Sequence, residues 1–151
     1  MNLTGNYFTV EFWFYTSSFD GVDTPFLGNH GSSGTYGWSI YKSNGNNLRF
    51  YYSTTGSNMT DPYVACTASN STWHHLAVVR NNTELYYWLD GVQVGVTKTI
   101  SDPIHSGSDL TIGTDLGYST DVYFNGKLDE VNISNYAKYL ANFVPNARGA
   151  F

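Results

Sequence analysis

Two adjacent acids, Asp129 and Glu130, and two adjacent histidines, His74 and His75, are the pairs in this sequence whose types suit acid–base or metal chemistry. Retaining glycoside hydrolysis needs two carboxyl groups about 5 Å apart. Both pairs lie in alternating segments, and neighbouring strand residues point to opposite faces of a sheet. We therefore expect neither pair to flank one bond or to chelate one ion, and we interpret the acid pair as structural.

His75 has a second interpretation besides metal ligation. Its position favours packing between Trp13 and Trp88, with a hydrogen bond to Glu11 or Glu130. No serine lies in a nucleophile elbow, and Cys66 has no recognisable reactive setting. The sequence therefore predicts that the protein is not an enzyme.

Aromatic residues in loops are the best candidates for binding a sugar, because rings cover the apolar faces of pyranoses and short polar groups bond their hydroxyls. A strand aromatic is already explained by packing, and local packing remains the alternative for each loop residue as well. The predicted ligand-binding residues are Tyr36, Trp38, Tyr63, Tyr118 and Tyr123, with Asn29 and His30 as additional donors.

The elements that position these side chains are predicted to be strands. Phe8, Val10, Phe12 and Phe14 alternate with polar or amphipathic residues, which gives a strand with one apolar face. Turn signals such as Asn44-Gly45 and Asp90-Gly91 recur at short intervals. We predict an all-β fold, an antiparallel β-sandwich in a single domain spanning 1–151, with one short helix within Asn135 to Phe143. The predicted core residues are Phe12, Phe14, Leu76, Val78, Leu89, Ile112, Val131 and Ile133.

Composition excludes several classes of protein. The net charge is −5 with only seven Lys and Arg residues, and these do not cluster, so nucleic acid is not expected as a partner. No apolar run approaches the roughly 18 residues of a membrane span, so no membrane insertion is expected. A single cysteine, Cys66, rules out an internal disulfide.

Five blocks of sequence, in order, resemble the LamG-like jelly roll of the concanavalin A-like superfamily. They are FTVEFWFY from Phe8, YGWSIYKSNGNNLRFYY from Tyr36, WHHLA from Trp73 with LYYWLDG from Leu85, LTIG from Leu110, and FNGKLDEV from Phe124. The tail from Ala137 to Pro145 is similar to the endings of LamG-like modules in phage and other virion structural proteins. The resemblance implies a concanavalin A-like jelly roll and an extracellular or virion-surface location.

The resemblance also bears on metal binding and on the fold's edge. Pentraxins, which are similar at the first block, bind calcium in the loop that aligns with Gly113 to Gly117, so the resemblance implies one Ca²⁺ at Asp115 and Asp121 as an alternative to plain loop solvation. Family members usually begin with an extra strand, and only seven residues precede Phe8. We expect the exposed edge to be covered by the termini, including Val144–Phe151, or by a neighbouring subunit or domain, which allows a homo-oligomer.

The function predicted from these observations is a non-catalytic, lectin-like module that binds glycan, including host cell-surface glycan, within a larger virion or extracellular protein. The alternative is a structural module that decorates a particle or mediates subunit contacts without a glycan ligand. A glycan array with the isolated domain distinguishes the two.

Overall fold

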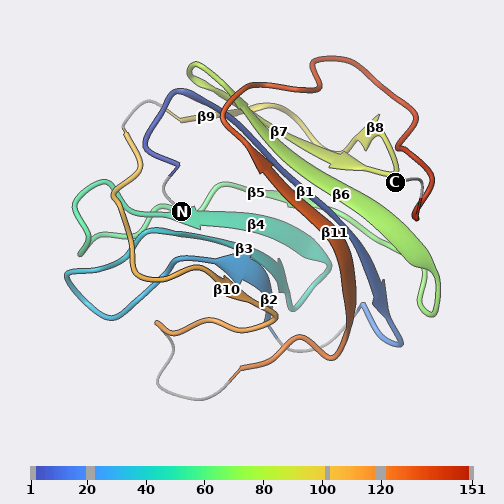
Figure 1. The fold of residues 1–151 in the computed structure, drawn as a ribbon, viewed down its shortest axis with the longest axis horizontal. Coiled ribbons are helices and arrows are strands. Elements are labelled where there is room, and N and C mark those ends of the chain that lie inside the picture. The colour runs from blue at the N-terminus through green and yellow to red at the C-terminus, as the bar shows by residue number, and fades with distance from the viewer. Residues whose placement is uncertain (1–2, 20–22, 101–102, 118–121, 150–151) are drawn as a thin grey trace.

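The alternating run at the start of the chain forms a ten-residue strand, one of the interior strands of a sandwich of two antiparallel sheets (Figure 1). The computed structural model describes residues 3–19, 23–100, 103–117 and 122–149. The strands are β1 (Tyr7–Thr16), β2 (Thr24–Gly28), β3 (Trp38–Ser43), β4 (Asn47–Tyr52), β5 (Tyr63–Ala65), β6 (Trp73–Asn81), β7 (Glu84–Leu89), β8 (Val92–Gln93), β9 (Lys98–Thr99), β10 (Thr111–Ile112) and β11 (Gly126–Ser134).

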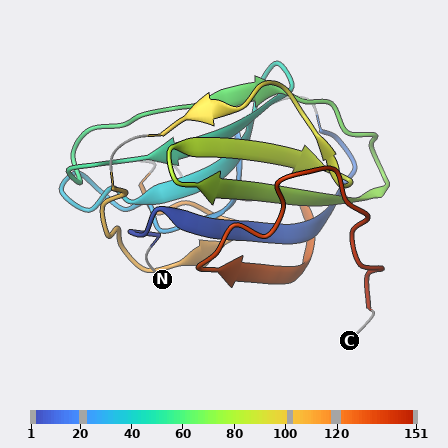
Figure 2. The ribbon, with the colours of Figure 1, turned by 90° about the horizontal axis from the view of Figure 1, so that it is seen from above.

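The strands divide into two layers. Sheet A has the order β11-β1-β6-β7-β8, with β9 also pairing with β7, and sheet B has the order β10-β2-β3-β4-β5. The long strands of sheet A and the shorter strands of sheet B form the separate layers seen in Figures 1 and 2. All pairings are antiparallel, which confirms the predicted β-sandwich and agrees with a jelly roll.

The core lies between the inner faces of the two sheets, and most of its members follow from strand alternation. Phe12 and Phe14 on β1 and Leu76 on β6 are fully buried, while Leu89, Val131 and Ile133 pack against them with partial exposure. The prediction was wrong for Ile112, which is 52% exposed. Its strand, β10, has two residues and forms the edge of sheet B, so the Ile112 side chain has no opposing layer to cover it.

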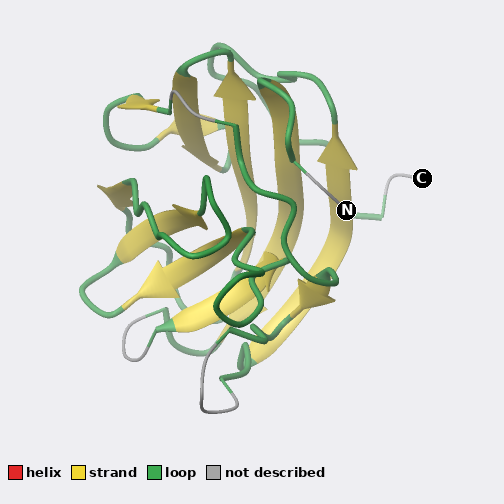
Figure 3. Cartoon of the chain, turned by 90° about the vertical axis from the view of Figure 1, so that its left-hand side faces the viewer, coloured by secondary structure: helices red, strands yellow, loops and turns green. Residues whose placement is uncertain are grey.

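The predicted helix within Asn135 to Phe143 does not form, and no helix occurs among the described residues (Figure 3). Residues 135–149, here called the C-terminal strap, instead cross the outer face of sheet A, in red in Figure 2. The Lys138 amide donates to Thr9 Oγ1 at 2.9 Å, and the Phe143 amide donates to the Gly91 carbonyl at 2.9 Å. Such short helices are marginal alone, and here bonds to the sheet replace the helical ones. The described residues therefore contain no helix that could cross a bilayer.

A β-bulge in β11 overturns the expectation that Asp129 and Glu130 point to opposite faces. Between the pairs Glu11–Asn132 and Trp13–Asp129, two residues of β11 lie opposite one residue of β1. Glu130 has a φ of 51°, as expected for an extra residue that breaks the strand's alternation. Leu128 and Val131 still pack on the core, and both acids lie on the outer face of sheet A.

The acids on the bulge hold the end of the strap. Asp129 pairs with Arg148 at 3.0 Å, and Glu130 accepts a hydrogen bond from the Gly149 amide. Phe143 packs on the outer face against His75 and Trp88 and does not lie along the β11 edge, and Val144 is 91% exposed. Phe151 lies outside the described residues. The missing first strand and its cover by a neighbour remain predictions.

Candidate functional site

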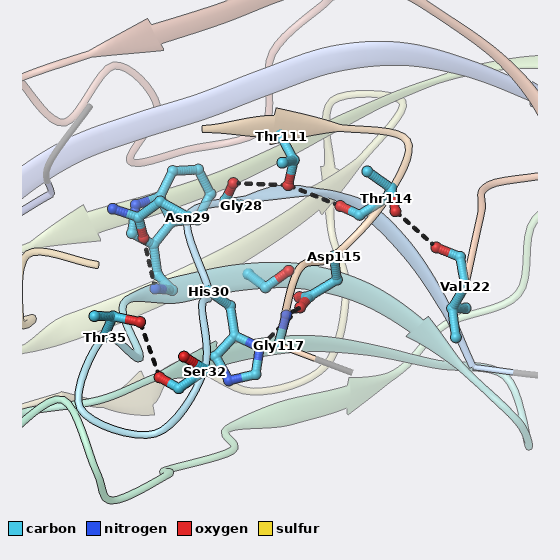
Figure 4. Close-up of polar contacts among 12 residues, drawn as sticks. Gly28, Asn29, His30, Ser32, Thr35, Thr111, Thr114, Asp115, Gly117 and Val122 are labelled. Carbon is cyan, nitrogen blue, oxygen red and sulfur yellow. Dashed lines mark hydrogen bonds and ion pairs between the residues drawn. The ribbon is translucent and has the colours of Figure 1, made fainter. Parts of the chain in front are cut away.

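The loop that follows β2 meets the loop that follows β10, and this contact joins two of the predicted site residues (Figure 4). His30 Nδ1 lies 2.9 Å from Asp115 Oδ1, and the same oxygen accepts a hydrogen bond of 2.7 Å from the Gly117 amide. Both side chains are buried. Burial by itself would raise the pKa of Asp115, but hydrogen bonds from His30, Tyr41 and the Gly117 amide outweigh it, and the pKa is lowered. The pair therefore fixes one loop to the other.

Asn29 and Trp38 belong to the framework of this loop pair and do not face solvent. Asn29 is fully buried, and its Oδ1 accepts a hydrogen bond of 2.9 Å from the Trp38 amide. The Trp38 ring is 0% exposed and stacks on Phe50 in the core. A ring without exposed surface offers no face to a sugar, so the prediction that Trp38 binds ligand was wrong. Its place on β3, opposite Tyr52 of β4, explains this burial.

Tyr36 and Tyr123 are the predicted aromatics that reach the surface at this end of sheet B. Tyr36 is half-buried with its ring centroid 4.7 Å from that of His30. Tyr123 is 63% exposed and pairs through its backbone with Thr114. Tyr118 lies outside the described residues.

One Ca²⁺ at Asp115 and Asp121 remains a prediction. Asp121 lies outside the described residues, and Asp115 already uses Oδ1 for His30 and Gly117. Across the described part of the chain, no three His, Cys, Asp or Glu side chains form a group suited to a metal ion.

Tyr63 stands apart from the loops, on β5, and is the centre of a cluster that sequence reasoning missed. Its ring is 49% exposed and lies 5.2 Å from the Arg49 guanidinium and 5.8 Å from the Lys98 ammonium. Arg49 donates from Nη1 to the Tyr51 hydroxyl at 3.2 Å and forms an ion pair with Asp61. We call Arg49, Tyr51, Asp61 and Tyr63 the sheet B cluster.

Two polar atoms of the sheet B cluster remain without partners. Arg49 Nε and Asp61 Oδ1 are buried and have no hydrogen-bond partner among the described residues. Burial raises the pKa of Asp61, and the nearby Arg49 charge offsets this only in part. The rest of these side chains is accessible, because Arg49 is 25% exposed and Asp61 is 28% exposed, so a ligand hydroxyl can reach their outer atoms.

Tyr41 connects the sheet B cluster to the loop pair. Its ring lies 5.2 Å from that of Tyr51 in an edge-to-face contact, and its hydroxyl contributes to the lowered pKa of Asp115. The outer side of β3 and β4 thus carries a continuous row from His30 to Tyr63. Alternation could have revealed this row, because Arg49 and Tyr51 interleave with the buried Leu48 and Phe50.

A second polar cluster lies on the outer face of sheet A, beneath the C-terminal strap. The Glu11 carboxylate accepts hydrogen bonds from Lys138 Nζ at 2.5 Å and from the Tyr139 hydroxyl at 2.8 Å, and His75 Nε2 lies 3.4 Å away. Burial by itself would raise the pKa of Glu11, but these three partners lower it to about 2. The predicted contacts of His75 with Trp13 and Glu11 are therefore confirmed.

His74 is held separately from His75. Its Nδ1 lies 2.7 Å from Asp90 Oδ2, and its Nε2 lies 2.9 Å from Ser69 Oγ. As expected from alternation, the two imidazole rings have different partners, although the His75 backbone amide donates to the other oxygen of Asp90, Oδ1, at 2.8 Å.

Comparison with solved structures finds the same fold at low sequence identity. The CBM40 domain of the Ruminococcus gnavus IT-sialidase matches with a TM-score of 0.70 and 14% identity, over 89% of this chain and 79% of that one. The same domain bound to α2,3-sialyllactose matches with a TM-score of 0.68 and 15% identity, over 93% of this chain and 80% of that one.

Two matches are to longer proteins. A Bacteroides ovatus protein assigned to carbohydrate binding matches with a TM-score of 0.68 and 16% identity, over 89% of this chain and 38% of that one. Domains LG4–5 of the mouse laminin α1 chain match with a TM-score of 0.65 and 14% identity, over 94% of this chain and 41% of that one. At these identities the matches show a shared fold.

No curated protein sequence matches this chain. The family model of the concanavalin A-like lectin/glucanases superfamily, Laminin_G_3, matches residues 1–141. The matched region includes all eleven strands and the beginning of the strap. The chain therefore belongs to the concanavalin A-like lectin/glucanases superfamily.

Proposed function

We propose that this chain is a non-catalytic, lectin-like carbohydrate-binding module whose ligand lies against the outer face of sheet B. The observation that carries the proposal is the sheet B cluster, in which the half-exposed Tyr63 ring lies beside the partly exposed side chains of Arg49 and Asp61. A sugar ring can cover the aromatic face while its hydroxyls bond to the exposed parts of the Arg49 guanidinium and the Asp61 carboxylate.

The loop end of sheet B extends the proposed surface. Tyr36 and Tyr123 supply further rings there, and the contact between His30 and Asp115 keeps the two loops in place. Structural neighbours in carbohydrate-binding proteins support the same class of ligand. An extracellular location fits a module that binds glycan, and attachment to a virion surface remains a prediction.

The non-catalytic part of the proposal rests on the acids of the bulge. Asp129 and Glu130 lie on one face, but both carboxylates already bond to the strap, through Arg148 and the Gly149 amide. We expect no release of reducing ends from any bound glycan. Glycan cleavage that disappears in Glu130→Gln would contradict this part of the proposal.

Two tyrosines with equal exposure allow a matched test of the binding surface. Tyr63 is 49% exposed in the sheet B cluster, and Tyr7 is 50% exposed on β1 of sheet A. A glycan array with the wild-type protein should give saturable hits. Tyr63→Ala should weaken them by roughly five- to tenfold, because stacking contributes on the order of 1–1.5 kcal/mol, while Tyr7→Ala should leave them unchanged.

The alternative function predicts a different set of results. A structural or subunit-contact module would give no hits on the array and would self-associate in sedimentation. Equal losses in Tyr63→Ala and Tyr7→Ala would place the ligand away from the sheet B cluster and overturn the assignment of the surface.

A further inference from the structure

A cavity of about 80 Å³ lies between the C-terminal strap and the outer face of sheet A. Its walls include Trp13, His75, Glu130, Asn132 and Asn146. The space exceeds what a single water needs, about 10–15 Å³ by the same measure, so a small molecule fits. This cavity is on the opposite sheet from the sheet B cluster, so an inference about it does not rest on the function proposed above.

Several polar groups of the cavity are not used by the protein. His75 is 5% exposed, and its Nδ1 has no hydrogen-bond partner among the described residues. Glu130 uses Oε1 for the Gly149 amide, and Asn132 uses Oδ1 for the Ser134 hydroxyl. Within the described ranges, Glu130 Oε2 and Asn132 Nδ2 have no further partner. The Asn146 carboxamide likewise has no partner in the described parts of the chain. The cavity therefore offers both donors and acceptors beside a ring.

The charges of the cavity argue against an ionic ligand. A free anion would meet the carboxylates of Glu11 and Glu130, with one ammonium, that of Lys138, against them. A calcium ion would need six or more oxygen ligands, whereas the Glu11 oxygens already accept from Lys138 and Tyr139. Among the described residues, no three His, Cys, Asp or Glu side chains form a group that could hold a metal ion of another kind. A neutral molecule with several hydroxyls can bond to both the donors and the acceptors of the cavity, because each hydroxyl can donate and accept. It brings no negative charge near the carboxylates and needs no set of metal ligands.

The backbone of β11 also favours this use of the cavity. Glu130 has a left-handed conformation with a φ of 51°, which is costly for a residue other than glycine. The bulge that requires it keeps the Glu130 side chain on the cavity side while Val131 stays on the core. Bulges commonly re-aim a side chain in this way beside binding sites.

We propose that the cavity under the C-terminal strap is a second binding site, for a neutral polyhydroxylated molecule: a free polyol or the terminal ring of a saccharide. The Trp13 ring covers an apolar edge of the ligand. Glu130 Oε2 accepts from its hydroxyls, and the carboxamides of Asn132 and Asn146 donate to them and accept from them.

The test is a titration followed by NMR, with glycerol, methyl α-glucoside and lactose as probes. The indole NH of Trp13 and the ring protons of His75 should shift saturably, with dissociation constants on the order of millimolar for such small ligands. Saturation by glycerol would identify a polyol site, and saturation by the glycosides alone would identify a site for a terminal sugar ring. Absence of saturable shifts with all three probes, up to roughly 100 mM, would overturn the proposal.

Variants separate this site from the surface on sheet B. Asn132 and Asn146 are exposed and make few contacts, so the double variant Asn132→Ala, Asn146→Ala should fold normally and bind at least about tenfold more weakly. Asn135→Ala, another exposed asparagine of the strap, is the matched control and should bind normally. Tyr63→Ala should leave the Trp13 and His75 shifts unchanged. Shifts that persist in the double variant, or that disappear in Tyr63→Ala, would contradict the proposed site.

Discussion

The outer faces of the two sheets carry the same kinds of side chain, aromatic rings beside charged groups, but different segments cover them. The C-terminal strap crosses sheet A, whereas on sheet B the loops bury Tyr41 and leave Tyr63 half-exposed. On sheet A, the C-terminal strap covers Trp88 and His75 and supplies partners to Glu11. On sheet B, Tyr63 is half-exposed and polar atoms of Arg49 and Asp61 lack partners. The difference shows that an aromatic, charged strand face becomes either a packing surface or a binding surface according to what crosses it.

Removal of Glu11 should be the strongest test of this contrast. Glu11→Ala leaves Lys138, Tyr139 and His75 without their shared carboxylate, and we expect a loss of about 3 kcal/mol in the free energy of unfolding. Asp61→Asn, at the corresponding ion pair of sheet B, should change it by less than about 1 kcal/mol, because this pair is more exposed. Urea denaturation measures the free energy of unfolding of both variants. Equal losses would show that the two carboxylates stabilise the two faces to the same extent.

Two glycines with the same backbone conformation isolate the contribution of the strap. Gly91 and Gly113 both have a φ of 76°, but an added Cβ at Gly91 would lie 1.8 Å from the Phe143 carbonyl oxygen, and one at Gly113 would meet nothing within 4 Å. Gly113→Ala should cost about 1 kcal/mol of backbone strain. Gly91→Ala should cost about 2–3 kcal/mol, because it also displaces the strap. Equal costs in thermal or urea unfolding would mean that the strap contributes nothing measurable here.

Glu11 on sheet A and Asp61 on sheet B should contribute to the pH dependence of stability with opposite signs. The folded-state pKa of Glu11 is about 2, below its ordinary value of 4.5, so its carboxylate stabilises the fold fully above pH 4.5 and loses this effect as the pH falls toward 2. The pKa of Asp61 is raised in the folded state. Its protonated form therefore stabilises the fold at low pH, and this contribution is lost as the pH rises through the folded-state pKa. Unfolding free energies measured from pH 7 to 2 should fall less steeply in Glu11→Gln than in the wild type. An unchanged slope would contradict the assigned role of Glu11.

Cys66 provides the smallest expected signal and a reference for the other tests. The thiol is buried, and burial raises its pKa to about 12, so Ellman's reagent should not react with the native protein. In Gly91→Ala, we expect the strap to detach without opening the core. The fluorescence of Tyr139 should then change, while Cys66 should stay unreactive. Rapid labelling of Cys66 in that variant would show that the strap and the core unfold together.

Strand alternation predicted the sandwich and most of its core, because a period of two is a local property of the chain. Phe12, Leu76 and Val78 lie where alternation puts them. The same rule failed at Glu130, where a bulge shifts the alternation by one residue, and at Ile112, where the strand is too short and too near the edge to be covered. Neither feature has a signal in the residue types alone.

The candidate site was predicted less completely than the fold. His30 and Asp115 were each selected, but only the structure brings these two loops together across 85 positions of sequence. The position of Tyr63 after a loop predicts a binding role for it, whereas Arg49 and Tyr51 lie within a strand and carry no such signal. Trp38 follows the same loop as Tyr36, and strand pairing with β4 carried it into the core.

The sequence by itself determined the two-faced strands, the apolar core between them and the residue types on the outer faces, because each depends on neighbours along the chain. Only the tertiary structure decided which outer face stays open. That choice depends on where residues 135–149 run after β11. These residues form hydrogen bonds with Thr9 and Gly91, and each bond joins residues more than 50 positions apart in the sequence. Contacts of this kind join segments far apart in the sequence, so no local pattern encodes them.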